Sequence, residues 1–158
     1  MHRIKLFCMD VDGTLTDGKI YMGSNGEVMK AFDIKDGYGI HEILPKHGIV
    51  PVIITGRTSR IVENRARELG IAELHQGAHE KLPVLETLIE KYGCSWENVA
   101  YVGDDVLDLE CMETCGLPMC PADAVDQVKK ISAYVAKRHA GDGAVREMIE
   151  WMIGEDAM

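Results

Sequence analysis

Short, continuous apolar runs alternate with helical patterns along this chain, and that alternation constrains its fold more than any other feature. Strands that are apolar at every position are buried on both faces, which is typical of a parallel sheet covered by helices on each side. We therefore predict an α/β fold, a Rossmann-like three-layer sandwich with a central parallel sheet. The clearest strand candidates are 4–9, 49–54 and 99–102, and weaker ones are 73–75, 117–120 and 133–135.

Glycine marks the expected ends of the helices between these strands, because it readily adopts the conformation that terminates a helix. A further helix near the C-terminus is predicted from apolar residues at helical spacing, among them Val145, Met148 and Met152. We expect residues 154–158 to be frayed. The four glycine-terminated patterns cover 36–47, 58–69, 81–92 and 105–115.

Composition limits the classes of function. The chain has 158 residues, 46% of them hydrophobic, which suits a single domain spanning residues 1–158. A net charge of −9 argues against nucleic acid or an anionic membrane as a partner. We find neither a long apolar segment nor a signal-peptide pattern, and five cysteines without a C-x-x-C pair favour reduced thiols. We therefore expect a cytoplasmic protein.

One segment, residues 19–34, interrupts the alternation. Asn25-Gly26 is a strong signal for a β-hairpin, and folding about this pair would place Met22 opposite Met29. At least one face of such a hairpin would be apolar and would need a packing partner. That partner could be the hairpin's own domain or another subunit.

Two carboxylates follow the first predicted strand directly. Asp10 and Asp12 are separated by one residue and are followed by a Gly-Thr turn. Ligands of open α/β sheets bind at the carboxyl ends of the strands. Because two close negative charges repel unless a cation or a proton relieves them, this pair suggests a divalent metal. It would also supply a nucleophile and an acid/base group.

Three further signals lie at strand ends or at a helix start. Thr55-Gly56-Arg57 follows the second clear strand, Lys81 begins a predicted helix, and Gly-Asp-Asp-Val-Leu-Asp at 103–108 follows the third. Each signal is weak or moderate alone. Together, in this order, they predict one cleft that holds carboxylates, a hydroxyl and a lysine.

With these motifs the chain resembles the phosphatase branch of the haloacid dehalogenase superfamily, over residues 4 to about 153. The resemblance implies an aspartyl-phosphate intermediate and Mg²⁺, which prefers hard oxygen ligands. The implied roles are nucleophile for Asp10, general acid/base for Asp12, charge stabilisation for Thr55 and Lys81, support for Asp108, and metal binding for Asp10, Asp104 and the carbonyl of Asp12.

The residues by themselves leave other roles open. Thr55 could only cap a helix, Lys81 could be a solvated lysine at a helix start, and Asp108 could be a surface acid.

The resemblance is strongest to a subgroup without a separate cap domain, in which hairpins cover neighbouring active sites of a homotetramer. It implies a phosphorylated sugar acid as substrate, an eight-carbon octulosonate 8-phosphate rather than a nine-carbon nononate 9-phosphate. Gly56, Arg57 and Arg65 are the expected substrate-binding residues, because guanidinium groups bind carboxylates bidentately and Arg65 lies two helical turns after Arg57. A nononate 9-phosphate phosphatase, a broad small-phosphate phosphatase and a non-catalytic tetramerising domain are the alternatives.

Overall fold

The fold is described by a computed structural model that covers residues 3–156. Its centre is a six-stranded sheet with the order β5-β4-β1-β6-β7-β8, in which each neighbouring pair of strands is parallel. The predicted α/β fold is confirmed. The strands are β1 (Leu6–Met9), β4 (Val50–Ile54), β5 (Glu73–His75), β6 (Val99–Val102), β7 (Leu117–Cys120) and β8 (Tyr134–Val135).

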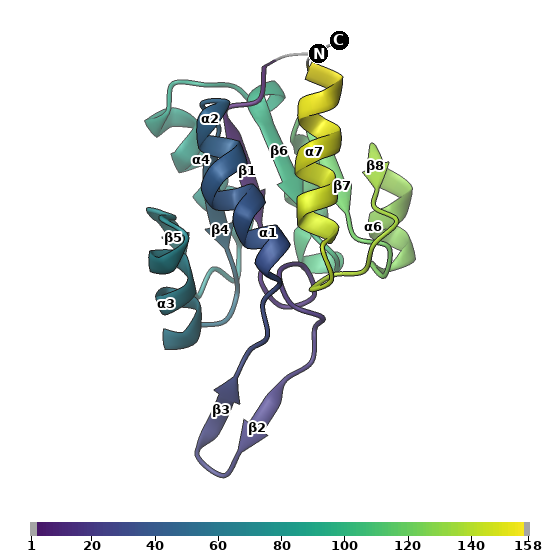
Figure 1. Ribbon diagram of the computed structural model, residues 1–158. Helices are drawn as coiled ribbons and strands as arrows, with labels where there is room; N and C mark the ends of the chain where they lie inside the picture. The colour runs from purple at the N-terminus through teal and green to yellow at the C-terminus, as the bar shows by residue number, and fades with distance from the viewer. Residues whose placement is uncertain (1–2, 157–158) are drawn as a thin grey trace.

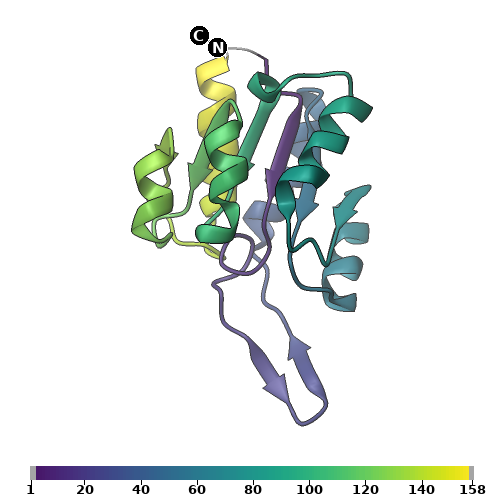
Figure 2. The ribbon, with the colours of Figure 1, turned by 180° about the vertical axis from the view of Figure 1, so that it is seen from behind.

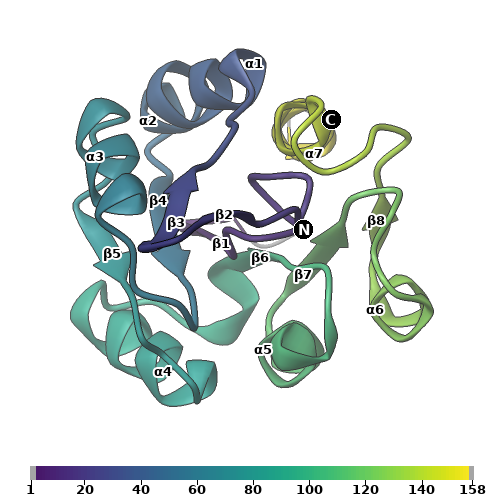
Figure 3. The ribbon, with the colours of Figure 1, turned by 90° about the horizontal axis from the view of Figure 1, so that it is seen from below.

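Helices cover both faces of this sheet (Figures 1 and 3), as the three-layer prediction requires. One face carries α1 (Ile34–Tyr38), α2 (Leu44–Lys46), α3 (Arg60–Glu68) and α7 (Ala144–Asp156), and the other carries α4 (Lys81–Lys91), α5 (Leu109–Thr114) and α6 (Asp126–Ile131). Three short helical segments, η1 (Gly39–Ile43), η2 (Trp96–Asn98) and η3 (Val106–Asp108), complete the described helices.

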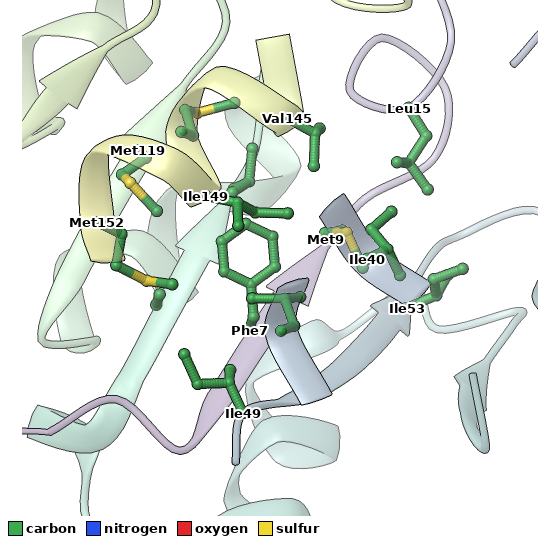
Figure 4. Close-up of a cluster of buried hydrophobic side chains, with 14 of the residues drawn as sticks. Phe7, Met9, Leu15, Ile40, Ile49, Ile53, Met119, Val145, Ile149 and Met152 are labelled. Atoms are coloured by element: carbon green, nitrogen blue, oxygen red, sulfur yellow. The ribbon is translucent and has the colours of Figure 1, made fainter. Parts of the chain in front are cut away.

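The two faces of the sheet enclose separate apolar clusters. Along β1, Phe7 and Met9 belong to the cluster beneath α7 and η1, whereas Leu6 and Cys8 belong to the cluster beneath α4 and α5. Figure 4 shows Phe7 surrounded by residues of the first cluster, including Ile149 of α7. All four β1 side chains are fully buried, which explains why the strand is apolar at every position.

Strand β1 is the point where the direction of strand order reverses. The chain passes from β1 to β4 on one side and reaches β6 on the other side only much later. The loops that leave β1 and β6 therefore diverge, and such a switch point opens a crevice at the carboxyl edge of a parallel sheet. The register that pairs Met9 with Val102 sets Asp10 beside Gly103 and Asp104.

The helices differ from expectation in several places, among them the pattern over 105–115, which forms η3 and α5, and the pattern over 58–69, which forms α3 from Arg60 to Glu68. The pattern over 36–47 forms three consecutive segments, α1, η1 and α2, instead of one helix. The short helix α6 was not predicted, because six residues give little periodicity. Helix α7 continues to Asp156, residues 157–158 lie outside the described part, and the fraying expected for 154–158 stays a prediction.

The predicted hairpin is present, but its predicted register is wrong. Strands β2 (Tyr21–Gly23) and β3 (Gly26–Met29) pair Tyr21 with Met29 and Met22 with Glu27, with an irregularity between Tyr21 and Met22. A turn centred on Asn25-Gly26 would need positive φ at Asn25. Asn25 has no positive φ, whereas Gly26 has a φ of 114°, so the left-handed residue follows the turn.

The hairpin extends beyond the carboxyl edge of the sheet, away from the helices (Figures 1 and 2). Met22 and Val28 are each 62% exposed and Met29 is 52% exposed. Its own chain therefore does not cover these apolar side chains.

The state of the cysteines and the possibility of a membrane-spanning helix were the two further expectations. None of the five cysteines forms a disulfide within the described residues, and Cys94 alone among them is not buried. Over residues 3–156, the helices are too short or too polar to cross a bilayer.

A buried carboxylate fixes the start of α7. Asp36 is 2% exposed, and its Oδ1 accepts a hydrogen bond from the backbone N of Arg146 at 2.9 Å. Its Oδ2 has no hydrogen-bond partner among the described residues. Burial raises the pKa of Asp36 to about 6, and the hydrogen bond from Arg146 offsets only part of this effect.

The raised pKa of Asp36 predicts a pH-dependent stability. The folded state keeps this proton up to about pH 6, whereas the unfolded chain loses it near 3.8. The protonated carboxyl group therefore stabilises the fold fully at low pH, and this contribution is lost as the pH rises through about 6. Relative to Asp36→Asn, we expect the parent's free energy of unfolding to fall by about 2 kcal/mol between roughly pH 4 and pH 7.

Urea unfolding of both proteins at several pH values measures this difference. Asp17→Asn, at an exposed position, is the control and should show no such trend. If the free energies of unfolding of the parent and Asp36→Asn differed by a constant amount across this pH range, the raised pKa of Asp36 would be contradicted.

Candidate active site

A cleft at the carboxyl edge of the sheet brings the predicted motifs together. Its walls come from the loops that follow β1, β4 and β6 and from the first residue of α4. Most of the predicted site residues therefore meet in one place. The cleft is lined by Asp10, Asp12, Thr55, Gly56, Arg57, Lys81, Asp104, Asp105, Leu107 and Asp108.

Three of the lining carboxylates form a group that could hold a metal ion. One oxygen from each of Asp10, Asp104 and Asp108 lies within 4.8 Å of the others. Carboxylate oxygens are hard ligands of the kind that divalent cations such as Mg²⁺ and Ca²⁺ prefer.

The crowding of these carboxylates perturbs their ionisation. Burial raises the pKa of Asp10, and Asp108 raises it further, whereas Lys81 lowers it. Burial raises the pKa of Asp104, and the negative charges of Asp10 and Asp108 raise it further, to about 8. Without a cation, the cluster therefore carries excess negative charge that protons must relieve.

Lys81 is buried between two of the acids. Its side chain is 3% exposed, and its Nζ lies 2.7 Å from Oδ1 of Asp108 and 3.1 Å from Oδ1 of Asp10. Burial would lower the pKa of Lys81, but Asp108 and Asp10 outweigh this effect and raise it. This burial excludes the alternative, open at the level of the sequence, that Lys81 is a solvated lysine at a helix start.

Asp108 is fixed by hydrogen bonds on both oxygens. Its Oδ1 accepts from Lys81 and from the hydroxyl of Tyr101 at 2.9 Å, and its Oδ2 accepts from the backbone N of Asp104 at 3.2 Å. Asp108 is 1% exposed, so it is not a surface acid. It orients both Lys81 and the loop that carries Asp104.

The loop after β1 passes very close to Asp104. Gly13 has a φ of 85°, and a Cβ at this position would lie 2.1 Å from Oδ2 of Asp104. The Thr14 hydroxyl donates to Oδ1 of Asp104 at 3.1 Å. Glycine at position 13 is therefore required both by the backbone conformation and by the space that the carboxylate occupies.

The Thr55-Gly56-Arg57 segment forms another wall of the cleft. Thr55 is 3% exposed, and the N-cap of α3 is Ser59, so Thr55 does not cap that helix. The Arg57 side chain is half exposed and lies 3.8 Å from Oε2 of Glu27 on the hairpin.

Comparison with known proteins identifies the family. Residues 70–149 match the sequence model of haloacid dehalogenase-like hydrolases. The chain is 47% identical over 150 residues to 3-deoxy-D-manno-octulosonate 8-phosphate phosphatase of Escherichia coli K12, covering 95% of this chain and 79% of that protein. The chain belongs to the haloacid dehalogenase-like hydrolases.

Solved structures of similar hydrolases share the whole fold. The octulosonate phosphatase of Moraxella catarrhalis, crystallised with a magnesium ion, a phosphate ion and KDO, matches with a TM-score of 0.91 and 42% identity over 96% of this chain and 86% of that one. The cobalt-bound deoxy-D-mannose-octulosonate 8-phosphate phosphatase of Haemophilus influenzae matches with a TM-score of 0.94 and 37% identity, over 98% and 90% of the two chains.

Within this haloacid dehalogenase-like hydrolase, Arg65 does not line the cleft. Its guanidinium lies 5.4 Å from the ring centre of Phe32 and 3.2 Å from Glu68. The expectation that Arg57 and Arg65 share a helical face is wrong, because α3 begins only at Arg60. Helical periodicity therefore does not relate the two arginines.

The sequence analysis missed several residues that contact this hydrolase's cleft. Tyr101 and Thr14 donate to Asp108 and Asp104, and Lys30 of the hairpin binds Oδ1 of Asp12 at 2.5 Å. A tyrosine hydroxyl inside an otherwise apolar strand was the only local signal, since a buried hydroxyl requires a partner.

Gly13→Ala tests the close approach between the β1 loop and Asp104. The added Cβ would collide with the Asp104 carboxylate, so we expect divalent-cation affinity to fall about tenfold or more, a free energy of at least roughly 1.4 kcal/mol. Gly26→Ala is the matched control, because Gly26 also has positive φ but its Cβ would meet nothing within 4 Å.

The control should lose stability through backbone strain, about 1–2 kcal/mol, and keep its cation affinity. Calorimetric titration with a divalent cation and urea unfolding measure the two quantities. Equal cation affinities in the two variants would show that Gly13 is needed for backbone conformation alone.

Proposed function

We propose that this chain is a Mg²⁺-dependent phosphatase that hydrolyses 3-deoxy-D-manno-octulosonate 8-phosphate to the free sugar acid and phosphate. The observation that carries the proposal is the cluster of Asp10, Asp104 and Asp108 around buried Lys81 at the sheet edge. Its occurrence in a chain 47% identical to an octulosonate 8-phosphate phosphatase supports the substrate assignment.

The residues of the cleft fit Mg²⁺. Asp10 and Asp104 offer carboxylate oxygens, and we assign the backbone carbonyl of Asp12 as the third protein ligand. Both oxygens of Asp108 already accept hydrogen bonds, which favours a supporting role for that residue. When bound, Mg²⁺ would neutralise charge on the phosphoryl group and its nucleophile.

In the proposed first step, a carboxylate oxygen of Asp10 attacks phosphorus in line with the bond to the sugar oxygen. A P–O bond to Asp10 forms as the P–O bond to the sugar breaks, and Asp12 gives its proton to the leaving oxygen. Lys81 and the Thr55 hydroxyl stabilise the negative charge of the phosphoryl oxygens. Lys81 contacts Asp10 already, which places a cation at the attack site.

In the second step, Asp12 removes a proton from water, and the resulting oxygen nucleophile attacks phosphorus. The P–O bond to Asp10 breaks, phosphate leaves and Asp12 is protonated again, so the site returns to its starting state.

Arg57 is the proposed anchor for the substrate's carboxylate. It lies on the wall of the cleft, and its half-exposed guanidinium can form a bidentate pair with a carboxylate. Gly56 beside it leaves the backbone accessible. Because Arg65 lies elsewhere, we leave it out of the proposed substrate site.

We further propose that the whole chain is one catalytic domain without a separate cap domain, and that it forms a homotetramer. The hairpin of one subunit would cover the active site of a neighbour. Its exposed apolar residues Met22, Val28 and Met29 support this arrangement, because they lack a partner within their own chain.

Asp10→Asn is expected to abolish phosphate release while the fold is kept, because the amide is a poor nucleophile of nearly the same shape. Phosphate release with Mg²⁺ and thermal unfolding measure activity and folding. Asp17→Asn, in the same loop but outside the cleft, should retain parental turnover. A parental rate in Asp10→Asn would show that Asp10 is not the nucleophile.

Comparison of substrates tests both Arg57 and the choice of sugar acid. We expect the parent to prefer the eight-carbon 8-phosphate to the nine-carbon nononate 9-phosphate. Arg57→Ala should raise KM for the sugar-acid phosphate about 10- to 100-fold, the effect of losing a charged hydrogen bond. Glucose 6-phosphate has no carboxylate, so its KM should change little.

Arg60→Ala, at the exposed start of α3, is the matched control and should leave KM unchanged. Equal losses on both substrates in Arg57→Ala would contradict carboxylate recognition. Absence of turnover on any phosphate ester would favour the tetramerising domain.

A further inference from the structure

Lys30 lies in the hairpin with its side chain buried. It directly follows β3, its side chain is 1% exposed, and its Nζ lies 2.5 Å from Oδ1 of Asp12 and 2.9 Å from Oε2 of Glu27. Removing an ammonium group from water is costly unless carboxylates compensate it. A lysine on a protruding hairpin could easily remain solvated, so its burial between two acids is a specific arrangement.

The two buried lysines of the site serve different acids. Lys81 contacts Asp10 and Asp108 on the metal side of the cleft, whereas Lys30 contacts Asp12. The hydrogen bond from Lys30 goes to Oδ1 of Asp12, which leaves Oδ2 for proton transfer.

A general acid works only when its oxygen lies within hydrogen-bond reach of the leaving atom. The Asp12 side chain is 21% exposed and sits on a loop, where a carboxylate can occupy several rotamers. A fixed ammonium on one oxygen selects one of these rotamers. Such restriction of a catalytic group can contribute substantially to rate.

We propose that Lys30 is a positioning residue that holds the Asp12 carboxylate in its catalytic orientation, with Glu27 holding Lys30 in turn. Glu27 also lies 3.8 Å from Arg57, so an unbroken series of opposite charges links the acid/base group to the proposed carboxylate anchor. The hairpin thereby serves the active site of its own chain. This inference rests on the proposed acid/base role of Asp12.

Dependence on the leaving group distinguishes positioning from a general structural role. An alkoxide leaving from a sugar phosphate needs the proton of Asp12, whereas nitrophenolate leaves without one. We expect Lys30→Met to slow formation of the aspartyl-phosphate from the sugar phosphate about tenfold or more, a fraction of the total effect of general acid catalysis. KM should stay within about twofold, since the lost interaction is with Asp12 and not with substrate.

The same variant should release nitrophenolate from p-nitrophenyl phosphate in a burst at nearly the parental rate. Lys30→Arg should recover part of the loss on the sugar phosphate, because it restores a cation of different shape. Lys19→Met, at an exposed lysine just before β2, is the matched control and should behave like the parent. Single-turnover measurements on both substrates provide these rates.

Parental rates in Lys30→Met, or equal losses on the two substrates, would overturn the proposal. Crystal structures of the parent and of Lys30→Met give a test that does not depend on turnover. We expect the Asp12 carboxylate to leave its parental rotamer in the variant, and an unchanged rotamer would also overturn the proposal.

Different results would contradict the proposed function. A parent that cleaves p-nitrophenyl phosphate but not the octulosonate phosphate would contradict the substrate assignment, and glucose 6-phosphate would then serve as the alkyl phosphate in the comparison. A parent inactive on every ester would contradict the phosphatase proposal, while the two crystal structures would still decide the role of Lys30.

Discussion

Mutual repulsion between partly and fully buried carboxylates is the constraint on which this site depends. Asp10, Asp104 and Asp108 converge within 4.8 Å, at a sheet edge where burial already disfavours charge. Lys81 relieves part of this repulsion, and the Tyr101 hydroxyl fixes Asp108. The remaining negative charge suits a divalent cation, so the same repulsion that would destabilise an empty cluster provides affinity for the metal.

The parallel sheet brings these acids together from distant parts of the chain. Neighbouring parallel strands end at the same edge, and the register of Met9 with Val102 aligns the two loops that follow. Two positions in these loops lack side chains, which lets the loop after β1 approach Asp104 and lets the loop after β6 fold back at Asp108. A Cβ at Gly13 would occupy the space of Asp104, and one at Gly103 would lie 2.4 Å from the Cβ of Asp108.

The hairpin contacts this constellation through polar side chains of β3 and of the residue after it, whereas its apolar side chains are exposed. Lys30 and Glu27 connect the hairpin to Asp12 and Arg57. The apolar residues of β2 and β3 remain solvent-exposed within one chain, which fits the proposed packing against a neighbouring subunit. One short insertion can therefore order an acid/base group in its own chain and provide a surface for assembly.

Local chemistry was enough to predict the sheet and most of the cleft. A strand buried on both faces must be apolar at each position, and acids placed directly after such strands must emerge at one edge, so Asp10 and Asp104 could be placed together from the sequence. Tertiary structure alone decided that Lys30 binds Asp12, that Arg65 packs over Phe32, and that the hairpin turns before Gly26. These outcomes depend on long-range packing and on backbone dihedral angles, which leave no periodic or spacing signal in the residues themselves.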